Sequence, residues 1–230
     1  ICAANVICHV PDLNDLIQSV DLMLNKKGIF VFEEPYLGSM FEKISYDQIY
    51  DEHIFIFSVT SVNKIFTLFD MELIDVLPQT THGGSMRYVI GRKNSHKINA
   101  NVDKLLGKEK MANLDNISSC KKFKESCEIS KNKTRKNLLE FKRNNYKIAG
   151  YAATSKSTTI LNYCDIDNKI IDYICDTTPE KIGKFSPGTH IPIVDMSHFK
   201  KFIPDIAYLF AWNHKDEIFK KEKNFKGKWF

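Results

Sequence analysis

A phenol, two carboxylates and an imidazole stand side by side in the stretch SYDQIYDEHIFIFS. They are Tyr50, Asp51, Glu52 and His53, and an aromatic and aliphatic run follows them directly. An ionised group drawn toward an apolar wall must be paired or must shift its pKa. Groups whose pKa lies near neutrality are the ones that transfer protons efficiently. The pattern therefore predicts acid–base chemistry, with a surface pair of Glu52 and His53 as the structural alternative.

The segment THGGSMRY is a second candidate for ligand contact. Its two glycines allow a backbone to approach a ligand closely, and His82, Ser85 and Arg87 add hydrogen-bond donors. A hairpin turn explains the glycines equally well, and Arg87 alternatively forms an ion pair on a strand face. The three side chains are therefore predicted as substrate-binding residues, with His82 as a site residue of second rank.

The segment GYAATSKST differs by one residue from the phosphate-binding pattern G-x-x-x-x-G-K-[ST], because Ser155 replaces the second glycine. This difference, and the lack of an acidic strand for magnesium, argue against a nucleotide hydrolase or kinase. Backbone N–H groups at a helix start beside Lys156, Ser157 and Thr158 still predict an anion site. An NAD-linked dehydrogenase with Asp176 on a ribose is the weaker alternative, since G-x-G-x-x-G is absent.

The elements that must position these residues predict an α/β fold. Residues 1–95 read as strand, helix, strand, helix and two further extended segments, which is the back half of one α/β domain. Residues 96–146 are rich in lysine and asparagine with helical spacing, which predicts a helical connector. Residues 147–230 begin with strand, tight loop and helix and contain two more strands, which predicts a small parallel α/β (Rossmann-like) unit.

Composition narrows the protein class. No apolar run approaches the roughly 20 residues that cross a bilayer, and no secretory signal is recognisable, so we expect no membrane partner and a cytoplasmic location. The net charge of +5 comes from lysine-rich stretches without interleaved aromatic residues, which argues against nucleic-acid binding. The six cysteines contain no C-x-x-C pair, so no metal cluster or disulfide framework is predicted.

Seven segments in this order carry a resemblance to a known family: ANVICHVPDL, FEEPYLG, SYDQIYDEHIFIFS, THGGSMRY, GYAATSKSTTILNYC, FSPGTHIPI and AWNHKDEI. They resemble the sugar C-methyltransferases that act on nucleotide-linked deoxyketosugars. The resemblance implies a zinc-binding cysteine module, a class I methyltransferase-like domain for the donor S-adenosylmethionine, and a C-terminal α/β domain for the sugar nucleotide. The chain resembles a version truncated at its N-terminus, with zinc expected only in the missing module.

The resemblance also assigns roles to residues. Tyr50, Glu52 and His53 match the family's active-site group, with His53 as the leading base and Glu52 as its alternative or orienting partner. Tyr50 is then a hydrogen-bond donor to the substrate or its enolate. Asn5 and His9 match the strand end near the transferred methyl group and are expected to bind the cofactor.

Two assignments carry structural alternatives. Asn5 or His9 alternatively caps the helix that begins near Asp12. The anion site around Lys156 is assigned to the pyrophosphate of the sugar nucleotide, and His190 in the turn SPGTHIP is either structural or substrate-binding.

The predicted function is S-adenosylmethionine-dependent C-methylation of a nucleotide-linked 4-keto-deoxysugar through a base-generated enolate. The alternatives are a non-catalytic sugar-nucleotide-binding module and, less favoured, an NAD-linked sugar-nucleotide oxidoreductase.

Overall fold

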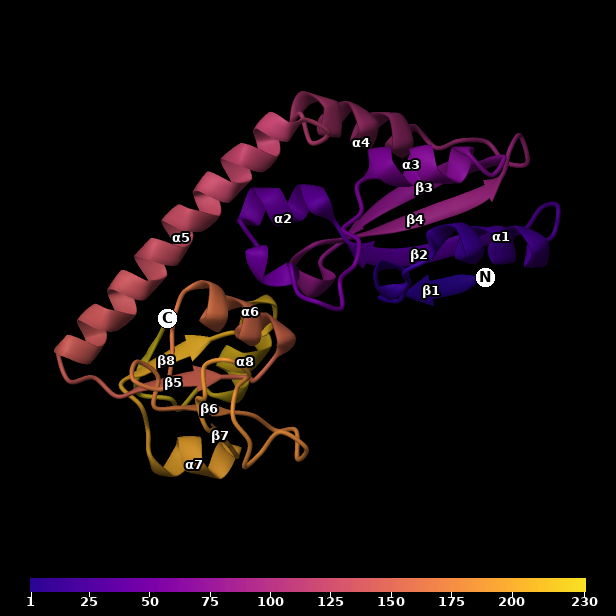
Figure 1. Cartoon of the computed structure of the whole chain (residues 1–230). Helices are drawn as coiled ribbons and strands as arrows, with labels where there is room; N and C mark the ends of the chain where they lie inside the picture. The colour runs from indigo at the N-terminus through magenta and orange to yellow at the C-terminus, as the bar shows by residue number, and fades with distance from the viewer. The chain divides into compact units, whose positions relative to one another are not determined.

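Strands and helices are interspersed along residues 1–230, all of which the computed structural model describes (Figure 1). The chain forms two units, each built around its own β-sheet. The N-terminal unit comprises residues 1–45 and 51–125, and the C-terminal unit comprises residues 46–50 and 126–230. The predicted α/β fold class is confirmed.

The N-terminal unit contains a four-stranded sheet in the order β1-β2-β4-β3. Its elements are β1 (Cys2–Ala4), α1 (Leu13–Met23), β2 (Ile29–Pro35), α2 (Leu37–Lys43), α3 (Val59–Thr67), β3 (Met71–Gln79), β4 (Ser85–Arg92) and α4 (Ala100–Met111). Strand β2 is parallel to β1 but antiparallel to β4, which also pairs antiparallel with β3. Strand β2 thus has one parallel and one antiparallel neighbour.

A side-chain cap defines where α1 begins. The carboxylate of Asp12 accepts the N–H groups of Asn14 and Asp15, both at 3.0 Å, so Asp12 itself is the N-cap of α1. The alternative that Asn5 or His9 caps this helix is wrong.

The core of the N-terminal unit is aromatic. Phe32 lies at its centre, with its ring 4.9 Å from that of Tyr88 and 5.2 Å from that of Phe30. Phe66 of α3 stacks on Phe32 at 5.7 Å. These rings are buried, and each such ring removes 150–250 Å² of surface from water. The packing holds α3 against β2 and β4.

A buried carboxylate attaches α4 to the same unit. Glu109 is 2% exposed and accepts hydrogen bonds from Tyr36 Oη at 2.9 Å and Val59 N–H at 2.7 Å. It also accepts the backbone N–H and the hydroxyl of Thr60, at 2.8 and 2.6 Å. The negative charge thus lies at the N-terminus of α3, where orphan N–H groups and the helix dipole favour it.

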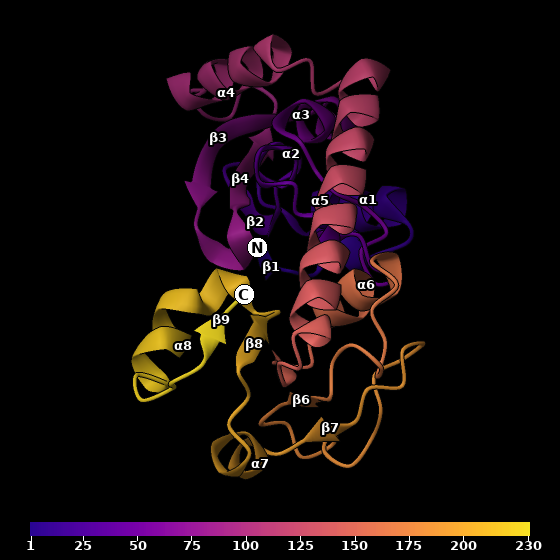
Figure 2. The same ribbon diagram turned by 90° about the vertical axis from the view of Figure 1, so that its left-hand side faces the viewer.

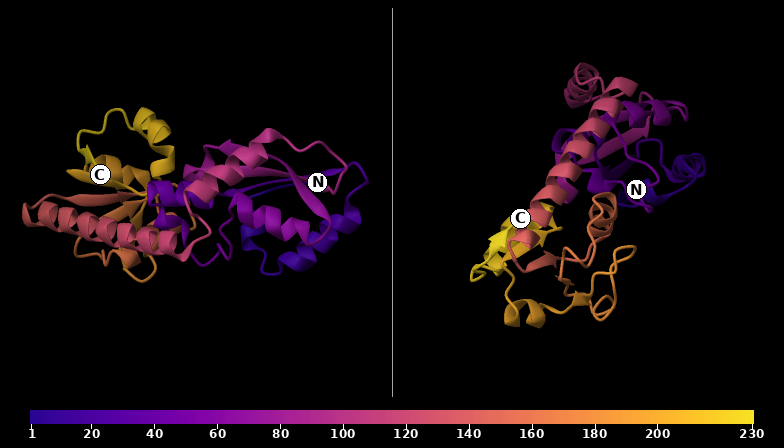
Figure 3. Two further views of the ribbon diagram at one scale, coloured as in Figure 1. Left: turned by 90° about the horizontal axis from the view of Figure 1, so that it is seen from above. Right: turned by 60° about the vertical axis from the view of Figure 1, so that its left-hand side comes forward.

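The C-terminal unit contains a five-stranded sheet in the order β7-β6-β5-β8-β9, and every pair is parallel. Its elements are α5 (Ile117–Arg143), β5 (Ile148–Tyr151), α6 (Ser155–Tyr163), β6 (Tyr173–Cys175), β7 (Ile193–Val194), α7 (Met196–Lys201), β8 (Ile206–Leu209), α8 (Lys215–Lys221) and β9 (Lys228–Trp229). Figure 3 shows α5 as one unbroken helix, of which residues 126–143 belong to this unit. No helix, including the 27-residue α5, has the length and apolar character needed to cross a membrane.

The strand order of this sheet reverses between β5 and β8. From β5 the chain proceeds outward to β6 and β7, then returns to β8 and β9, which lie beside α8 in Figure 2. Ligands of doubly wound sheets bind beyond the carboxyl ends of the strands at such a switch point. The fold therefore places a candidate binding edge after Tyr151 and Leu209.

Replacing Glu109 with alanine removes four hydrogen bonds to one buried carboxylate and leaves buried donors without acceptors. We expect the free energy of unfolding, measured by chemical denaturation, to fall by about 3 to 5 kcal/mol. The free energy of unfolding of Glu109→Gln should lie between those of the wild type and Glu109→Ala, because its amide retains one acceptor oxygen. Glu125→Ala, an exposed change in the same unit, should stay within about 0.5 kcal/mol of the wild type. Equal losses in Glu109→Ala and Glu125→Ala would contradict this role.

Candidate functional site

The carboxyl ends of β1 and β2 meet at one edge of the N-terminal sheet. Ala4 pairs in register with Glu33, and Glu33 pairs with Arg87 of β4. Asn5 follows β1 with a positive φ of 54°, and its N–H donates to the carbonyl of Glu33 at 2.9 Å. The chain therefore turns out of the sheet at Asn5, at the edge where open α/β sheets bind ligands.

Buried Glu34 holds the turn that follows Asn5. Its Oε1 accepts the N–H groups of Val6 at 2.9 Å and Ile7 at 2.7 Å, and the side chain is fully shielded from solvent. These charge-assisted bonds fix the start of the 3₁₀ turn η1 (Ile7–His9). Glu34 was not predicted as a site residue.

The carbonyl of Cys8 joins this turn to the segment that carries the charged quartet, which is Tyr50, Asp51, Glu52 and His53. It accepts the N–H of Ile54 at 2.9 Å and the N–H of Phe55 at 3.2 Å. Cys8 itself is fully buried. Burial first, and then hydrogen bonding to and the charge of Glu34, raise the pKa of the Cys8 thiol well above its ordinary value.

These backbone bonds bring His9 beside Glu52 and His53. His9 Nδ1 lies 2.6 Å from the carbonyl oxygen of Glu52, 43 positions along the chain, and the two imidazole rings are 5.2 Å apart at 50°. A carbonyl can only accept, so Nδ1 carries the hydrogen in this contact. His9 and His53 are half-buried, whereas Glu52 is exposed. The structure thus groups a residue predicted to bind the cofactor with two predicted catalytic residues.

The THGGSMRY segment lies beside the same edge. Arg87 pairs with Glu33 Oε2 through Nη2 at 2.9 Å and Nε at 3.2 Å, and the hydroxyl of Thr81 donates to Glu33 Oε1 at 2.7 Å. Burial alone raises the pKa of Glu33, but bonds from Thr81 and Arg87 and the charges of Arg87 and His82 outweigh it and lower that pKa. Arg87 therefore forms the strand-face ion pair that was its structural alternative. Ser85 is buried and donates to the carbonyl of Thr81 at 3.1 Å, while His82 is exposed with a φ of 51°.

The boundary between the two units runs through the charged quartet. Residues 46–50 belong to the C-terminal unit, and the N-terminal unit resumes at Asp51. Within the C-terminal unit, Tyr46 Oη lies 3.4 Å from Cys164 Sγ, and Asp47 Oδ2 accepts Trp212 Nε1–H at 2.8 Å. Tyr50 is half-buried at the end of this segment, and its role as a donor stays a prediction.

Lys156, predicted to contact pyrophosphate, is 8% exposed in the C-terminal unit. Its Nζ lies 5.3 Å from the centre of the Trp212 ring and 3.5 Å from Asn213 Oδ1. Burial lowers the pKa of Lys156, and the charge of Asp47 opposes that shift. Burial raises the pKa of Asp47, opposed by its bond from Trp212 and by the charge of Lys156. This network places the ammonium group beside the β5–β8 switch point.

The start of α6 is already capped within the protein. Thr154 Oγ1 accepts the N–H of Ser157 at 3.1 Å, and the Ser157 hydroxyl donates to the Thr154 carbonyl at 2.6 Å. The N–H of Thr158 points to the same carbonyl at 3.3 Å. A phosphate at Ser157 would have to replace the cap. His190 is exposed in a separate turn, where its N–H donates to Ser186 O at 3.1 Å.

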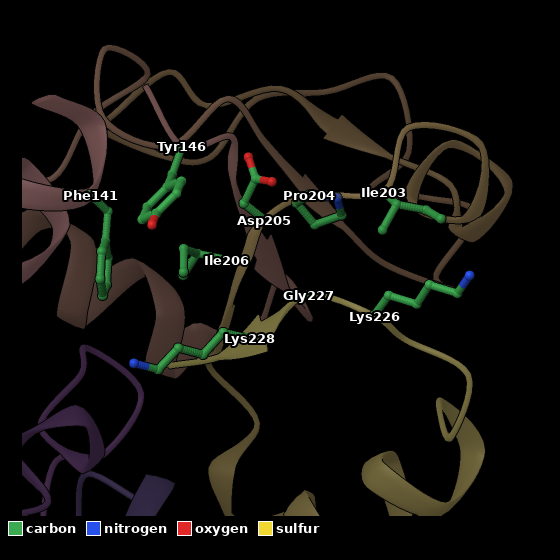
Figure 4. A pocket seen from close by; sticks show the side chains of 9 residues that line it. All are labelled: Phe141, Tyr146, Ile203, Pro204, Asp205, Ile206, Lys226, Gly227 and Lys228. Carbon is green, nitrogen blue, oxygen red and sulfur yellow. The ribbon is translucent and has the colours of Figure 1, made fainter. Parts of the chain in front are cut away.

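Two pockets of the C-terminal unit lie at opposite ends of its strands. A pocket of about 320 Å³ lies at the carboxyl ends, lined by Tyr151, Ala152, Cys175, Asp176, Thr177, Met196, Ala211, His214, Glu217, Ile218 and Lys221. A larger pocket of about 520 Å³ opens at the amino ends of β8 and β9, and Asp205 and Lys228 are among the residues that line it (Figure 4). Topology favours the smaller pocket as the ligand site.

Asp176, the candidate ribose ligand of the oxidoreductase alternative, bonds to the loops around it. Its Oδ2 accepts Ala153 N–H at 2.6 Å and its Oδ1 accepts Thr178 N–H at 2.8 Å. Burial alone raises the pKa of Asp176, but bonds from Thr178 and Ala153 and the charge of Lys181 lower it overall. The geometry favours a loop-building role for this carboxylate.

Comparison with known proteins agrees with this architecture. Residues 80–229 match a family model described as the C-methyltransferase C-terminal domain, and residues 1–76 match one described as a methyltransferase domain. The chain belongs to the C-methyltransferase family. It is also 28% identical over 218 residues to C-methyltransferase NovU of Streptomyces niveus, a match covering 94% of this chain and 52% of that protein. The chain thus spans about half the length of this curated relative.

Glu33→Gln should lower the free energy of unfolding by about 1 to 3 kcal/mol at neutral pH, because a carboxylate bonded to Arg87 and Thr81 is lost. The folded-state pKa of Glu33 lies below the ordinary value of 4.5, so this stabilisation is full above that pH. It disappears as the pH falls through the lower folded-state value.

Urea denaturation over a range of acidic pH measures this effect. The gap between wild type and Glu33→Gln should close in acid, whereas Glu125→Gln should track the wild type throughout. A gap that keeps its neutral size at the lowest pH where the protein stays folded would contradict the assignment.

Proposed function

We propose that the full-length protein transfers a methyl group from S-adenosylmethionine to a ring carbon of a nucleotide-linked 4-keto-deoxysugar. Membership of the C-methyltransferase family supports the reaction class. The observation that carries the proposal is the position of His53 beside His9 at the carboxyl edge of β1 and β2. The ketosugar assignment rests on the seven segments that resemble sugar C-methyltransferases.

The donor, when bound, supplies an electrophilic methyl carbon. Asn5 and His9 offer polar side chains at the edge where open α/β sheets bind ligands, and Asn5 is exposed there. We assign these two residues to donor contact. On this proposal the glycine-rich turn that completes the donor site precedes residue 1, as does the zinc module.

His53 acts as the base in this proposal. It removes the proton from the carbon beside the ketone, and the electron pair left behind delocalises onto the carbonyl oxygen. That carbon then bonds to the methyl group as the donor's carbon–sulfur bond breaks, and His53 releases its proton to solvent. A positioned base of this kind contributes roughly 100- to 10,000-fold in rate.

The choice between the two bases follows from burial. His53 is half-buried and therefore partly removed from water, whereas Glu52 is exposed and its backbone carbonyl orients His9. These facts favour His53 as the base and leave the Glu52 carboxylate as the alternative. A hydrogen bond from Tyr50 to the enolate oxygen would stabilise the transition state by about 3 kcal/mol. That role rests on the sequence alone.

Substrate contacts are assigned by exposure. His82 is exposed at the same edge and is the first candidate, whereas Ser85 and Arg87 have structural partners and rank second. In the C-terminal unit, we assign the nucleotide to the switch-point edge near Lys156, Ser157 and Thr158. His190 is retained as a peripheral contact.

Methyl transfer by the full-length protein tests the function directly. Mass spectrometry should detect a ketosugar nucleotide that gains a methyl group bonded to ring carbon. Methylation of another acceptor class would contradict the ketosugar assignment, and nucleotide binding without transfer would favour the non-catalytic binding module instead.

His53→Ala should lower turnover by roughly 100- to 10,000-fold and leave ground-state binding of both ligands nearly unchanged, because a base acts in the transition state. Glu52→Gln should lower turnover by a smaller factor than His53→Ala does. His96→Ala, which changes a half-buried histidine of the same unit outside this segment, should retain full activity. The base is not in this segment if turnover persists in both His53→Ala and Glu52→Gln.

Lys156→Met tests the nucleotide site, since methionine keeps an apolar stem against Trp212 and removes the charge. We expect affinity for the sugar nucleotide to fall by about 1.5 to 3 kcal/mol, or roughly 10- to 150-fold, as for a lost charge-assisted bond. Calorimetry measures this, with Lys169→Met as the exposed control and thermal unfolding as the check on the fold. Unchanged affinity in a folded Lys156→Met variant would remove Lys156 from the site.

A further inference from the structure

Three potential metal ligands converge at the edge that carries the predicted base. Cys8, His9 and His53 each offer one ligand atom, and these atoms all lie within 4.8 Å of one another. Tetrahedral zinc bound by one thiolate and two imidazoles places its ligand atoms about 3.4 Å apart, from bond lengths of about 2.0 to 2.3 Å. The group is therefore within about 1.4 Å of a bound geometry, a gap that rotation of the half-buried His53 ring narrows.

The backbone holds these ligands in place. Cys8 and His9 belong to the turn anchored by Glu34, and His53 directly precedes Ile54, whose N–H donates to the Cys8 carbonyl. Convergence therefore follows from hydrogen bonds to the main chain that do not involve the side chains of Cys8, His9 and His53. Such a site is largely formed before an ion arrives.

The second coordination sphere is also present. His9 directs Nδ1–H to the carbonyl of Glu52, which leaves Nε2 as its ligand atom. Metal-binding histidines almost always donate their other ring N–H in this way. The outer partner fixes both the tautomer and the plane of the ring.

The thiol proton must leave when a metal binds. Cys8 binds a metal as the thiolate, so its proton passes to solvent as the sulfur–metal bond forms, and charge and protons balance.

We propose that Cys8, His9 and His53 bind a divalent zinc ion, with water as the fourth ligand on the solvent side. Thiolate and imidazole donors select zinc and related transition metals over magnesium or calcium. A bound ion occupies the lone pair that His53 needs as a base. On the proposed function, on which this consequence rests, zinc therefore inhibits proton removal.

Cobalt(II) is the probe for ligation, used with the 230-residue chain so that no upstream cysteine module contributes. The wild type should develop near-ultraviolet thiolate-to-cobalt absorption that saturates at one ion per chain. Cys8→Ser should abolish it, because serine keeps a donor to Glu34 but removes the thiolate. Cys2→Ser, at an exposed cysteine, should retain it. No absorption in the wild type, or absorption that survives Cys8→Ser, would overturn the site.

A second measurement does not depend on the buried position. In competition with a zinc-binding dye, His53→Ala should weaken zinc affinity at least about 100-fold, since even outer partners of metal ligands contribute about 10- to 100-fold. His96→Ala should match the wild type, and circular dichroism confirms that both variants are folded. Equal zinc affinity in His53→Ala and His96→Ala would also overturn the site.

The inhibitory consequence has its own test in the full-length protein. Zinc added beyond the amount that fills the upstream module should lower methyl transfer by the wild type, and Cys8→Ser should relieve the inhibition. Equal zinc inhibition of the wild type and of Cys8→Ser would overturn the inference that zinc inhibits by occupying His53. Absence of methyl transfer with intact cobalt absorption would count against the proposed function alone.

Discussion

The geometry of the N-terminal site depends on the buried carboxylate of Glu34. One of its oxygens collects two consecutive backbone N–H groups, from Val6 and Ile7, and so sets the direction in which the chain leaves β1. A carboxylate without these donors would be strongly disfavoured in an aromatic core, and the N–H groups would lose their partners. The carboxylate and the turn therefore require each other.

The positions of His9 and His53 depend on that turn. It presents the Cys8 carbonyl to the backbone of Ile54 and Phe55, and this pairing carries His53 to His9. The imidazoles are thus brought together by main-chain bonds, while the Phe32 cluster beneath holds β2 and β4 in register. Rigid support of this kind allows reactive side chains to remain partly exposed without losing their positions.

The sequence predicted the elements whose signals are local. Apolar runs identified β2, β5, β6 and β8, and the period of Val59, Val62 and Phe66 identified α3. The strands β7 and β9 were missed because each has two residues, too few for any periodicity to register. Local propensity identifies a segment but not its neighbours, which is why the mixed pairing of β2 was not predicted.

The candidate site shows the same contrast between features that a local pattern predicts and features that depend on distant residues. Glu52 and His53 are adjacent in sequence and drew attention as charged groups before an apolar run, and a resemblance supplied their roles. Cys8 was overlooked because no second cysteine stands at metal-ligand spacing, and its neighbour His53 lies far along the chain. The burial of Lys156 likewise depends on Asp47 and Trp212, which no local pattern connects. Tertiary hydrogen bonds determine which of these distant residues lie together, and the periodicity of the sequence does not reveal them.

The discontinuous C-terminal unit bears on how the chain is made. Tyr46 contacts Cys164, which is synthesised 118 residues later. At about 5 to 20 residues per second, the ribosome leaves that segment waiting for roughly 6 to 24 seconds before its packing surface exists. The N-terminal unit can meanwhile complete its sheet with residues 46–50 looped out. Expression of residues 126–230 alone would leave α6 without the segment that packs on it, so a dissected C-terminal unit needs Tyr46–Tyr50 returned as a peptide or a graft.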